Sequence, residues 1–259
     1  MTKPLVSLIM TAYNSARYIK YAVDSVLKQT YENWELIIVD DCSDDGTWEV
    51  AYMLSTYDPR IKAYRNEENL GIVKNRNRAY SLSTGDLIAH FDNDDILERY
   101  SLDEMVRAFD QLPDVGLIYS DLAQIGEKGE HQLYSESKTF DLNALHQHGW
   151  RHFGMYRRKV MDHIDGYNEK LISGCEDGDL FMQIAEKFPI VRLPKVLYLY
   201  RAHPGNNSNN NKKCESCEER MVCNYMRVWS KSAKYDPITF KPLEVHHGIE
   251  DIRSLEPEN

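Results

Sequence analysis

Apolar runs of strand length alternate with amphipathic runs of helix length over the first half of the chain, and this alternation restricts the fold more than any other feature. The strand-like runs cover residues 5–10, 36–39, 61–64, 87–91 and 115–119. The stretches between them carry apolar residues at helical spacing. Since parallel strands need a crossover between them, these repeated β-α-β units predict an α/β fold with a mostly parallel sheet and helices on both faces.

Cap and turn residues predict where the helices of this half begin. Asn14 or Ser15 is placed to cap the first helix, whose apolar face starts at Tyr18. Residues 43–47 supply turn and cap residues for the second helix, and a third is expected after Gly71.

The second half of the chain is less regular. Residues 121–150 are expected to form a polar excursion with a short helix near residues 142–147. Helix-spaced apolar residues occupy 178–188, and an extended pattern resumes over 190–200. Residues 205–213 are polar and low in complexity, which predicts a loop or linker.

Length and composition limit the class of protein. The 259 residues, 42% of them hydrophobic, suffice for one sizeable core. The apolar runs fall far short of the roughly 20 residues that span a bilayer, and no signal-peptide pattern follows Met1, so a cytoplasmic protein without a transmembrane segment is expected. The net charge of −10 argues against nucleic acid as a partner. Peripheral contact with the inner face of the membrane stays open.

The strand-like run at 87–91 ends in Asp92, Asn93, Asp94 and Asp95. Three carboxylates this close repel one another, so gathering them is costly unless a cation lies among them. Mg²⁺ and Mn²⁺ prefer oxygen ligands and often share them with a substrate diphosphate. The sequence therefore favours a metal and diphosphate site here, with a solvated turn as the simpler alternative.

Polar residues also follow the first and second strands. Thr11 and Tyr13 come after the first, and Asp41 after the second. Because carboxyl ends of parallel strands meet at one edge of a sheet, these residues are expected to form a nucleotide crevice. Asp41 offers a carboxylate to a pyrimidine imide, unless it only caps the next helix. Gly71 and Arg76 add a helix start and a cation that suit a diphosphate.

A second acidic cluster begins the helix expected near residue 178. Glu176, Asp177 and Asp179 are suited to N-terminal capping, or one of them acts as a general base. A carboxylate is ionised at neutral pH without special tuning. His203, which follows the last strand, either completes a metal site or is an ordinary surface residue.

The five cysteines do not indicate a disulfide framework, because their number is odd and no export signal precedes them. Cys214, Cys217 and Cys223 are spaced C-x2-C-x5-C. They either bind a structural Zn²⁺ with a histidine as fourth ligand or remain unpaired thiols.

Five blocks, taken in order and spacing, resemble the family 2 glycosyltransferases, which are inverting enzymes of the GT-A fold. The blocks are residues 6–14, 29–47, 69–77, 85–95 and 166–177. The resemblance implies a GT-A domain over residues 1–208, with a nucleotide-sugar-binding half at 1–121 and an acceptor-side half at 122–208. Residues 209–259 would form a C-terminal extension.

Position by position, the resemblance assigns roles to single residues. Asp177 would be the catalytic base, with Glu176 beside it on the acceptor side. Thr11, Tyr13 and Asp41 would hold the nucleobase. The remaining nucleotide contacts would come from Gly71, Arg76, Asp92 and Asn93, and the Mn²⁺ or Mg²⁺ ligands would be Asp94, Asp92 and His203.

Two features depart from processive members of that family. Residues 183–187 do not match the Q-x-x-R-W motif, and no membrane helices are expected, which favours transfer of a single sugar. His90 also occupies a position that is usually apolar in the family.

The predicted function is metal-dependent, inverting transfer of one sugar, a hexose or N-acetylhexosamine, from a nucleotide sugar to an acceptor hydroxyl. A UDP-sugar is favoured as donor because Asp41 and Tyr13 suit uracil, and dTDP- and GDP-sugars stay open. The acceptor would be a carbohydrate or glycolipid in the synthesis of cell-surface polysaccharide or glycoconjugate. A non-catalytic sensor of nucleotide sugars is the main alternative, and the presence of Asp177 disfavours it. A sugar nucleotidyltransferase would carry a glycine-rich loop after the first strand, and residues 11–15 lack one.

Overall fold

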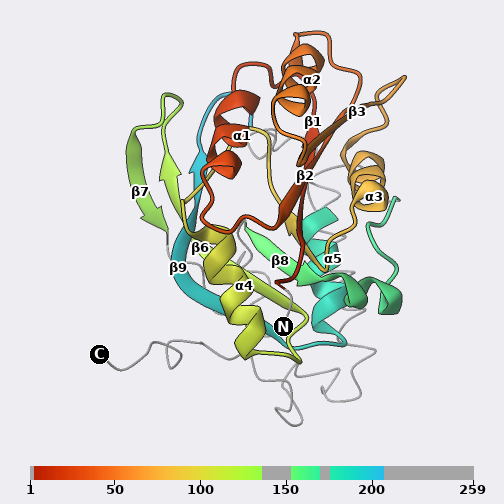
Figure 1. Ribbon diagram of the computed structural model, residues 1–259, viewed down its shortest axis with the longest axis vertical. Helices are drawn as coiled ribbons and strands as arrows, with labels where there is room; N and C mark the ends of the chain where they lie inside the picture. The colour runs from red at the N-terminus through yellow and green to blue at the C-terminus, as the bar shows by residue number, and fades with distance from the viewer. Residues whose placement is uncertain (1–2, 136–152, 170–175, 207–259) are drawn as a thin grey trace, which may run out of the picture.

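The computed structural model describes residues 3–135, 153–169 and 176–206 (Figure 1). The strands are β1 (Val6–Ala12), β2 (Trp34–Asp40), β3 (Ile61–Arg65), β4 (Leu87–His90), β5 (Ile96–Leu97), β6 (Leu117–Ile125), β7 (His131–Ser135), β8 (Gly154–Arg157) and β9 (Ile190–Arg201). The helices are α1 (Ile19–Leu27), α2 (Thr47–Tyr57), α3 (Ile72–Leu82), α4 (Ser101–Gln111) and α5 (Glu176–Ala185), with a 3-10 helix over Arg158–His163.

These strands form one sheet in the order β3-β2-β1-β4-β8-β6-β9-β5, and β7 pairs with β6. The four strands β3, β2, β1 and β4 are parallel, which confirms the predicted α/β class. Beyond β4 the sheet is mixed: β8 runs antiparallel to both β4 and β6, whereas β6 and β9 are parallel. The prediction of a mostly parallel sheet therefore holds for the first half of the described chain only. An apolar run predicts a strand but not its direction.

The expected polar excursion from residue 121 is wrong at its start, because β6 continues to Ile125. Asp121 sits within this strand and is fully buried. Its carboxylate accepts two hydrogen bonds from the guanidinium of Arg192 on β9, from Nε and from a terminal nitrogen, both at 2.9 Å. The expected boundary between the two halves, after residue 121, falls inside β6. The helix expected near 142–147 lies outside the described residues.

Helix α1 begins at Ile19, later than the expected caps imply. The backbone carbonyl of Ser15 accepts hydrogen bonds from the amides of Tyr18 and Ile19, and no side chain caps the helix. The Asn14 side chain instead accepts a hydrogen bond from the Asp44 amide at 3.1 Å. The loop after β1 is thus tied to the loop after β2, which fixes the shape of this sheet edge.

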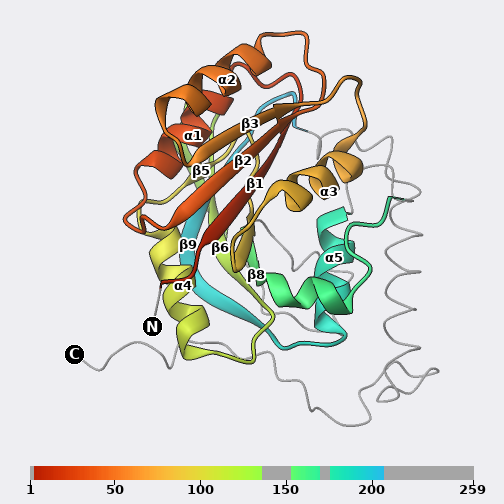
Figure 2. The same ribbon diagram turned by 45° about the vertical axis from the view of Figure 1, so that its right-hand side comes forward.

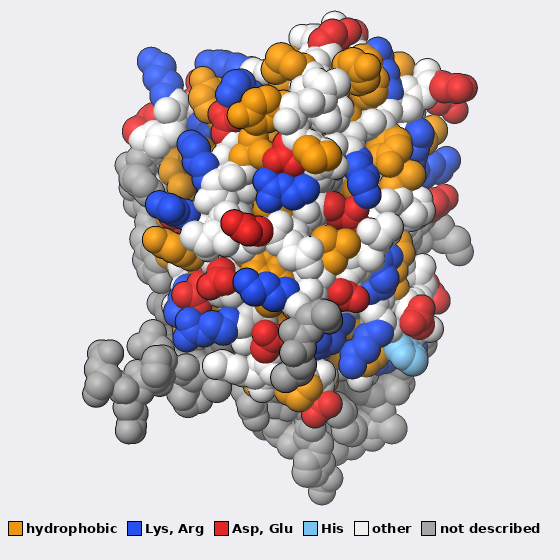
Figure 3. Space-filling model, in the orientation of Figure 1, with side chains coloured by type: hydrophobic (Ala, Val, Ile, Leu, Met, Phe, Trp, Pro, Cys, Tyr) orange, Lys and Arg blue, Asp and Glu red, His pale blue; other side chains and the backbone are white. Residues whose placement is uncertain are grey.

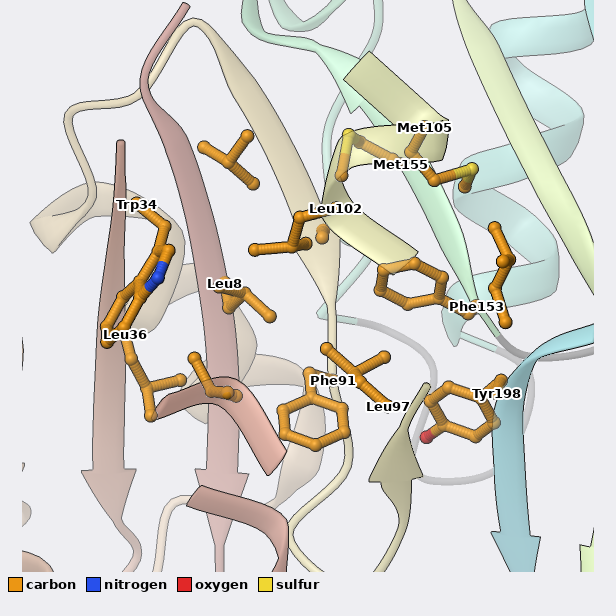
Figure 4. Packing of buried hydrophobic residues seen from close by; sticks show 14 of the residues in the cluster. Leu8, Trp34, Leu36, Phe91, Leu97, Leu102, Met105, Phe153, Met155 and Tyr198 are labelled. Carbon is orange, nitrogen blue, oxygen red and sulfur yellow. The ribbon is translucent and has the colours of Figure 1, made fainter. Parts of the chain in front are cut away.

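Helices cover both faces of the parallel strands, as Figure 2 shows for α1 and α2 on one side and α3 on the other. In β1, Leu8 and Met10 belong to the cluster on the α1 side, and Ile9 belongs to the cluster on the α3 side. Figure 4 shows the larger cluster, where Leu8 and Leu36 pack with Phe91 and with side chains of α4, β8 and β9. A sheet buried on both faces needs continuous apolar strands, which is why those runs were visible in the sequence.

Charged groups on the surface contribute much less to folding than these clusters do. Figure 3 shows acidic, basic and hydrophobic side chains interspersed over one face of the described residues. Pairs such as Lys20–Asp24, at 2.7 Å, and Arg60–Asp58, at 2.7 Å, are screened by solvent. Burial of apolar surface therefore supplies the main driving force for this fold.

Glu35 is a buried carboxylate that joins three strands. It accepts hydrogen bonds from the Ser7 hydroxyl on β1 at 2.6 Å, from the Thr84 amide before β4 at 2.6 Å, and from the Lys62 ammonium on β3 at 2.6 Å. Burial raises the pKa of Glu35, but these donors outweigh it and lower the pKa to about 2.

Because its folded-state pKa lies below the usual value of 4.5, Glu35 stabilises the fold above that pH and loses this contribution as pH falls toward 2. We expect Glu35→Gln to lower the free energy of unfolding at pH 7 by about 3 kcal/mol. The difference from wild type should shrink between about pH 4.5 and pH 2, as measured by urea unfolding. The exposed Glu32→Gln serves as the control, and a difference independent of pH would contradict this account.

Candidate active site

A cavity of about 640 Å³ opens at the carboxyl ends of β1, β2 and β4, where ligands bind in open α/β sheets. Its wall is formed by the ends of these strands and the loops after them, by the segment from the loop after β3 into α3, and by the segments after β6 and β9. Its lining residues are Thr11, Ala12, Tyr13, Asn14, Ser15, Arg17, Tyr18, Asp41, Asn69, Gly71, Ile72, Asn75, Asn93, Asp94, Glu127, His203, Pro204 and Gly205.

Most of the residues predicted for the site meet in this cavity. The residues from the sequence prediction that line it are Thr11, Tyr13, Asp41, Gly71, Asn93, Asp94 and His203. Tyr13 is 52% exposed, so its ring is free to cover a ligand. Four predicted residues do not line it, namely Arg76, Asp92, Glu176 and Asp177.

Asp41 is buried and organises the loop before α3. One of its oxygens accepts hydrogen bonds from the Leu70 amide at 2.9 Å and the Asn66 side chain at 2.5 Å, and the other from the Gly71 amide at 2.9 Å. These contacts hold the chain at Gly71, where φ is 80°. Asp41 therefore does not cap α2. The N-cap residue of α2 is Gly46, and the carboxylate of Asp45 before it accepts the Thr47 amide at 3.0 Å.

The tip of β4 is fixed to its neighbours. The Asn93 side chain donates to the Thr11 carbonyl at 2.7 Å, which joins the tips of β4 and β1. The Asp94 carboxylate lies 2.9 Å from Nε2 of His203. Burial and the neighbouring Asp92 raise the pKa of Asp94, and the hydrogen bond with His203 opposes this in part.

Asp95 turns away from the cavity and is completely buried. Its carboxylate accepts the Arg201 amide at 2.7 Å, and the Arg201 side chain donates to the Asp94 carbonyl at 2.8 Å. Burial and the charges of Asp94 and Asp92 raise the pKa of Asp95. Asp95 thus anchors the end of β9, which places His203 beside Asp94.

The donors suited to a divalent cation are Asp94 and His203, an oxygen and a nitrogen ligand side by side. Asp92, the third predicted ligand, instead faces Arg76, with a terminal guanidinium nitrogen 3.3 Å from its Oδ1. Within the described ranges, no group of three or more histidine, cysteine or acidic side chains has the arrangement of a metal site. Two protein ligands still fit Mg²⁺ or Mn²⁺, which commonly take their other ligands from substrate phosphates and water.

Arg76 connects the acidic tip of β4 to helix α5. Its guanidinium lies 3.3 Å from Asp92 and 3.4 Å from a carboxylate oxygen of Glu176. Arg76 and Glu176 are both buried. Burial raises the pKa of Glu176, and the charge of Arg76 lowers it in part. The sequence prediction placed Arg76 near the nucleotide. In the structure Arg76 does not line the cavity itself but contacts Asp92, which precedes the lining residues Asn93 and Asp94.

The three carboxylates proposed as the base at the start of α5 differ in burial and in hydrogen bonds. Asp179 is buried and accepts a hydrogen bond from Gln183 at 2.7 Å. Glu176 is buried against Arg76. Asp177 is partly exposed, and its carboxylate accepts only the adjacent Gly178 amide, at 2.7 Å, among the hydrogen bonds of the described residues. Of the three, Asp177 is the most accessible to an acceptor.

The sequence did not predict the wall of the cavity that Arg17, Tyr18 and Glu127 form. The Tyr18 hydroxyl donates to Glu127 at 2.8 Å, and Arg17 pairs with the same carboxylate at 2.5 Å. The Tyr18 ring also lies 4.4 Å from the His203 ring, measured between centroids. Sequence spacing assigned Tyr18 to the apolar face of α1. No local signal links it to Glu127, which is 109 residues away.

The three cysteines proposed to bind zinc lie outside the described residues.

The model of the family described as Glycosyl transferase family 2 matches residues 7–165. The chain belongs to this family. The match spans the strands whose tips form the cavity, and it identifies the protein as a glycosyltransferase.

Relatives of this glycosyltransferase include synthases of polysaccharides. It is 28% identical to the chondroitin synthase of Escherichia coli over 91% of its own length, and 31% identical to the hyaluronan synthase of Pasteurella multocida over 79%. The chain spans only 35% and 21% of those two proteins.

Solved structures share the fold of this glycosyltransferase. TarS residues 1–349 of S. aureus superpose with a TM-score of 0.70 at 22% identity, covering 88% of this chain and 66% of that one. The mannosyltransferase PcManGT of Pyrobaculum calidifontis gives 0.64 at 17% identity, covering 92% and 67%. These likenesses confirm the GT-A fold. Among the described residues, no helix is long and apolar enough to cross a membrane.

Proposed function

We propose that this glycosyltransferase moves one sugar from a UDP-sugar to an acceptor hydroxyl with inversion at the anomeric carbon. The observation that carries the proposal is the cavity in which Tyr13, Asp41, Asp94 and His203 meet at one sheet edge. The TarS structures of this fold include complexes with UDP and with UDP-GlcNAc. The named synthase relatives support a carbohydrate or glycolipid acceptor in polysaccharide synthesis.

The base and the diphosphate of the donor nucleotide are assigned to different parts of the cavity. Tyr13 offers an exposed aromatic face for stacking on the base, and Asp41 has lone pairs left to accept from a uracil imide. The diphosphate lies toward Asn93, Asp94 and His203. Asp94 and His203 would hold a Mn²⁺ or Mg²⁺ ion, which would supply positive charge to the leaving diphosphate. A Mn²⁺ complex of the similarly folded PcManGT supports this assignment.

The transfer is a single displacement. Asp177 accepts the proton of the acceptor hydroxyl as its oxygen attacks the anomeric carbon from the face opposite UDP. The new carbon–oxygen bond forms as the bond to the diphosphate oxygen breaks, and UDP leaves with that electron pair. Attack from the opposite face inverts the anomeric configuration. Glu176, held by Arg76, fixes the first turn of α5 and so the position of Asp177.

A panel of nucleotides tests the donor assignment. With Mn²⁺ present, UDP and UDP-sugars should raise the melting temperature more than GDP, GDP-mannose or dTDP at equal concentration. A ligand stabilises the fold through its affinity for the native state, so a 100-fold excess over the dissociation constant gives about 2.7 kcal/mol. The shift should be lost in Tyr13→Ala. Larger shifts with the guanine nucleotides would contradict the assignment of uracil.

A further inference from the structure

His90, the last residue of β4, is part of a buried polar network behind the cavity. Its side chain is 9% exposed and packs edge-on to the Tyr156 ring. Nδ1 of His90 lies 3.2 Å from a terminal nitrogen of Arg76, and Nε2 contacts the Tyr167 hydroxyl. The Tyr167 hydroxyl in turn lies 3.3 Å from that of Tyr156.

The partners of His90 determine which of its nitrogens carries the proton. A guanidinium has five donors and no acceptor, so Arg76 can only donate to Nδ1. Nδ1 must therefore be unprotonated, and the neutral ring carries its hydrogen on Nε2. That hydrogen is donated to the Tyr167 hydroxyl. The hydrogen bonds therefore run from Arg76 through His90 to the Tyr167 hydroxyl, and either tyrosine hydroxyl can donate to the other.

The other contacts of Arg76 connect this network to both sides of the reaction. A second terminal nitrogen lies 3.3 Å from Asp92 and 3.4 Å from Glu176. Asp92 directly precedes the lining residues Asn93 and Asp94, and Glu176 directly precedes Asp177. One guanidinium thus spans the tip of β4 and the start of α5, and His90 holds it from a third side.

We propose that His90, in its Nε2–H form, is a positioning residue that fixes Arg76 and thereby sets Asp177 relative to the donor cavity. This inference rests on the proposed function of Asp177 as base. The contacts with Asp92 and Glu176, at 3.3 and 3.4 Å, both use the same terminal nitrogen of Arg76 and are long for hydrogen bonds. The hydrogen bond to His90 holds the other terminal nitrogen, so it fixes the rotation of the guanidinium. Displacing a catalytic group by about 1 Å costs up to about 100-fold in rate.

The test compares His90→Leu, His90→Gln and a control, Tyr31→Phe, in the full chain. Leucine fills much of the volume but accepts no hydrogen bond. Glutamine restores both contacts, because its carbonyl oxygen accepts from Arg76 and its amide donates to Tyr167. Tyr31→Phe removes the hydroxyl of a buried tyrosine whose partner is the Pro4 carbonyl, outside the network of His90. The assay is release of UDP, with water as acceptor, from the UDP-sugar that gives the largest thermal shift.

We expect His90→Leu to lower kcat about tenfold or more and to leave KM for the donor within about twofold. His90→Gln should recover kcat to within about threefold of wild type, and Tyr31→Phe should match wild type. Unchanged kcat in His90→Leu, or equal losses in His90→Leu and His90→Gln, would overturn the proposal.

A second readout does not depend on catalysis. Nitrogen-15 spectra of histidine-labelled protein, assigned by the signal lost in His90→Gln, should show a protonated Nε2 and a bare Nδ1. A protonated Nδ1 would overturn the proposal even in an active enzyme. If the wild type releases UDP from no donor while this signature is present, the proposed function fails and the arrangement of the network stands.

Discussion

Asp177→Asn should lower turnover about 100-fold or more, while the affinity for UDP stays within about twofold of wild type. The substitution keeps the shape of the side chain but removes the oxygen that we propose accepts the proton of the acceptor. Asparagine is also as good a residue as aspartate at the start of a helix, so α5 should persist. Steady-state kinetics of UDP release and calorimetric titration of UDP separate the two quantities.

The neighbouring carboxylates provide the matched controls for this prediction. Asp179→Asn should retain activity close to wild type, because Asp179 is buried and accepts from Gln183. Glu176→Gln should lose activity together with stability, since it removes the partner of Arg76. A fully active Asp177→Asn beside an inactive but stable Asp179→Asn would move the base to Asp179. Full activity in all three variants would exclude a carboxylate base on α5.

Arg76→Met should lower the free energy of unfolding by about 3–5 kcal/mol. Removing the cation leaves Glu176, which is 3% exposed, without the charge that compensates it in a buried site. The same change removes the partner of His90 and one partner of Asp92. Urea unfolding monitored by tryptophan fluorescence measures the loss.

Lys74→Met is the matched control for this change. Lys74 lies on the same helix, two residues earlier, and its side chain is exposed, so its loss should cost less than about 0.5 kcal/mol. Adding Glu176→Gln to Arg76→Met should recover part of the stability, because the unpaired carboxylate is then neutral. Equal stability of Arg76→Met and Lys74→Met would show that the buried pair does not stabilise the fold.

The sequence predicted those parts of the fold and site that depend on local pattern. Strands buried on both faces give continuous apolar runs, so β1 to β4 were visible with nearly correct limits. The polar residues at their ends could be predicted too, because Thr11, Asp41 and Asn93 follow those runs within two positions. The α/β topology then brings them together, which is why seven predicted residues line one cavity.

Contacts between distant parts of the chain were not predictable in this way. The pair of Arg76 with Glu176 joins residues 100 positions apart, and no local spacing indicates it. The continuation of β6 through Asp121 was not predicted, because a charged residue is unusual in a buried strand. The partner that allows its burial, Arg192, lies 71 residues away in the sequence. The contacts of His90 were not predicted for the same reason. The sequence showed only a polar residue at a position that is usually apolar in the family, and its partners Arg76 and Tyr167 come from other elements.

The central claim is that a divalent cation at Asp94 and His203 joins the donor diphosphate to this sheet edge. Calorimetric titration of UDP into the protein, with Mn²⁺ and then with EDTA, tests it most directly. We expect UDP to bind about tenfold tighter or more with Mn²⁺, and Asp94→Asn to abolish that difference. Equal affinity for UDP in Mn²⁺ and in EDTA would contradict the claim.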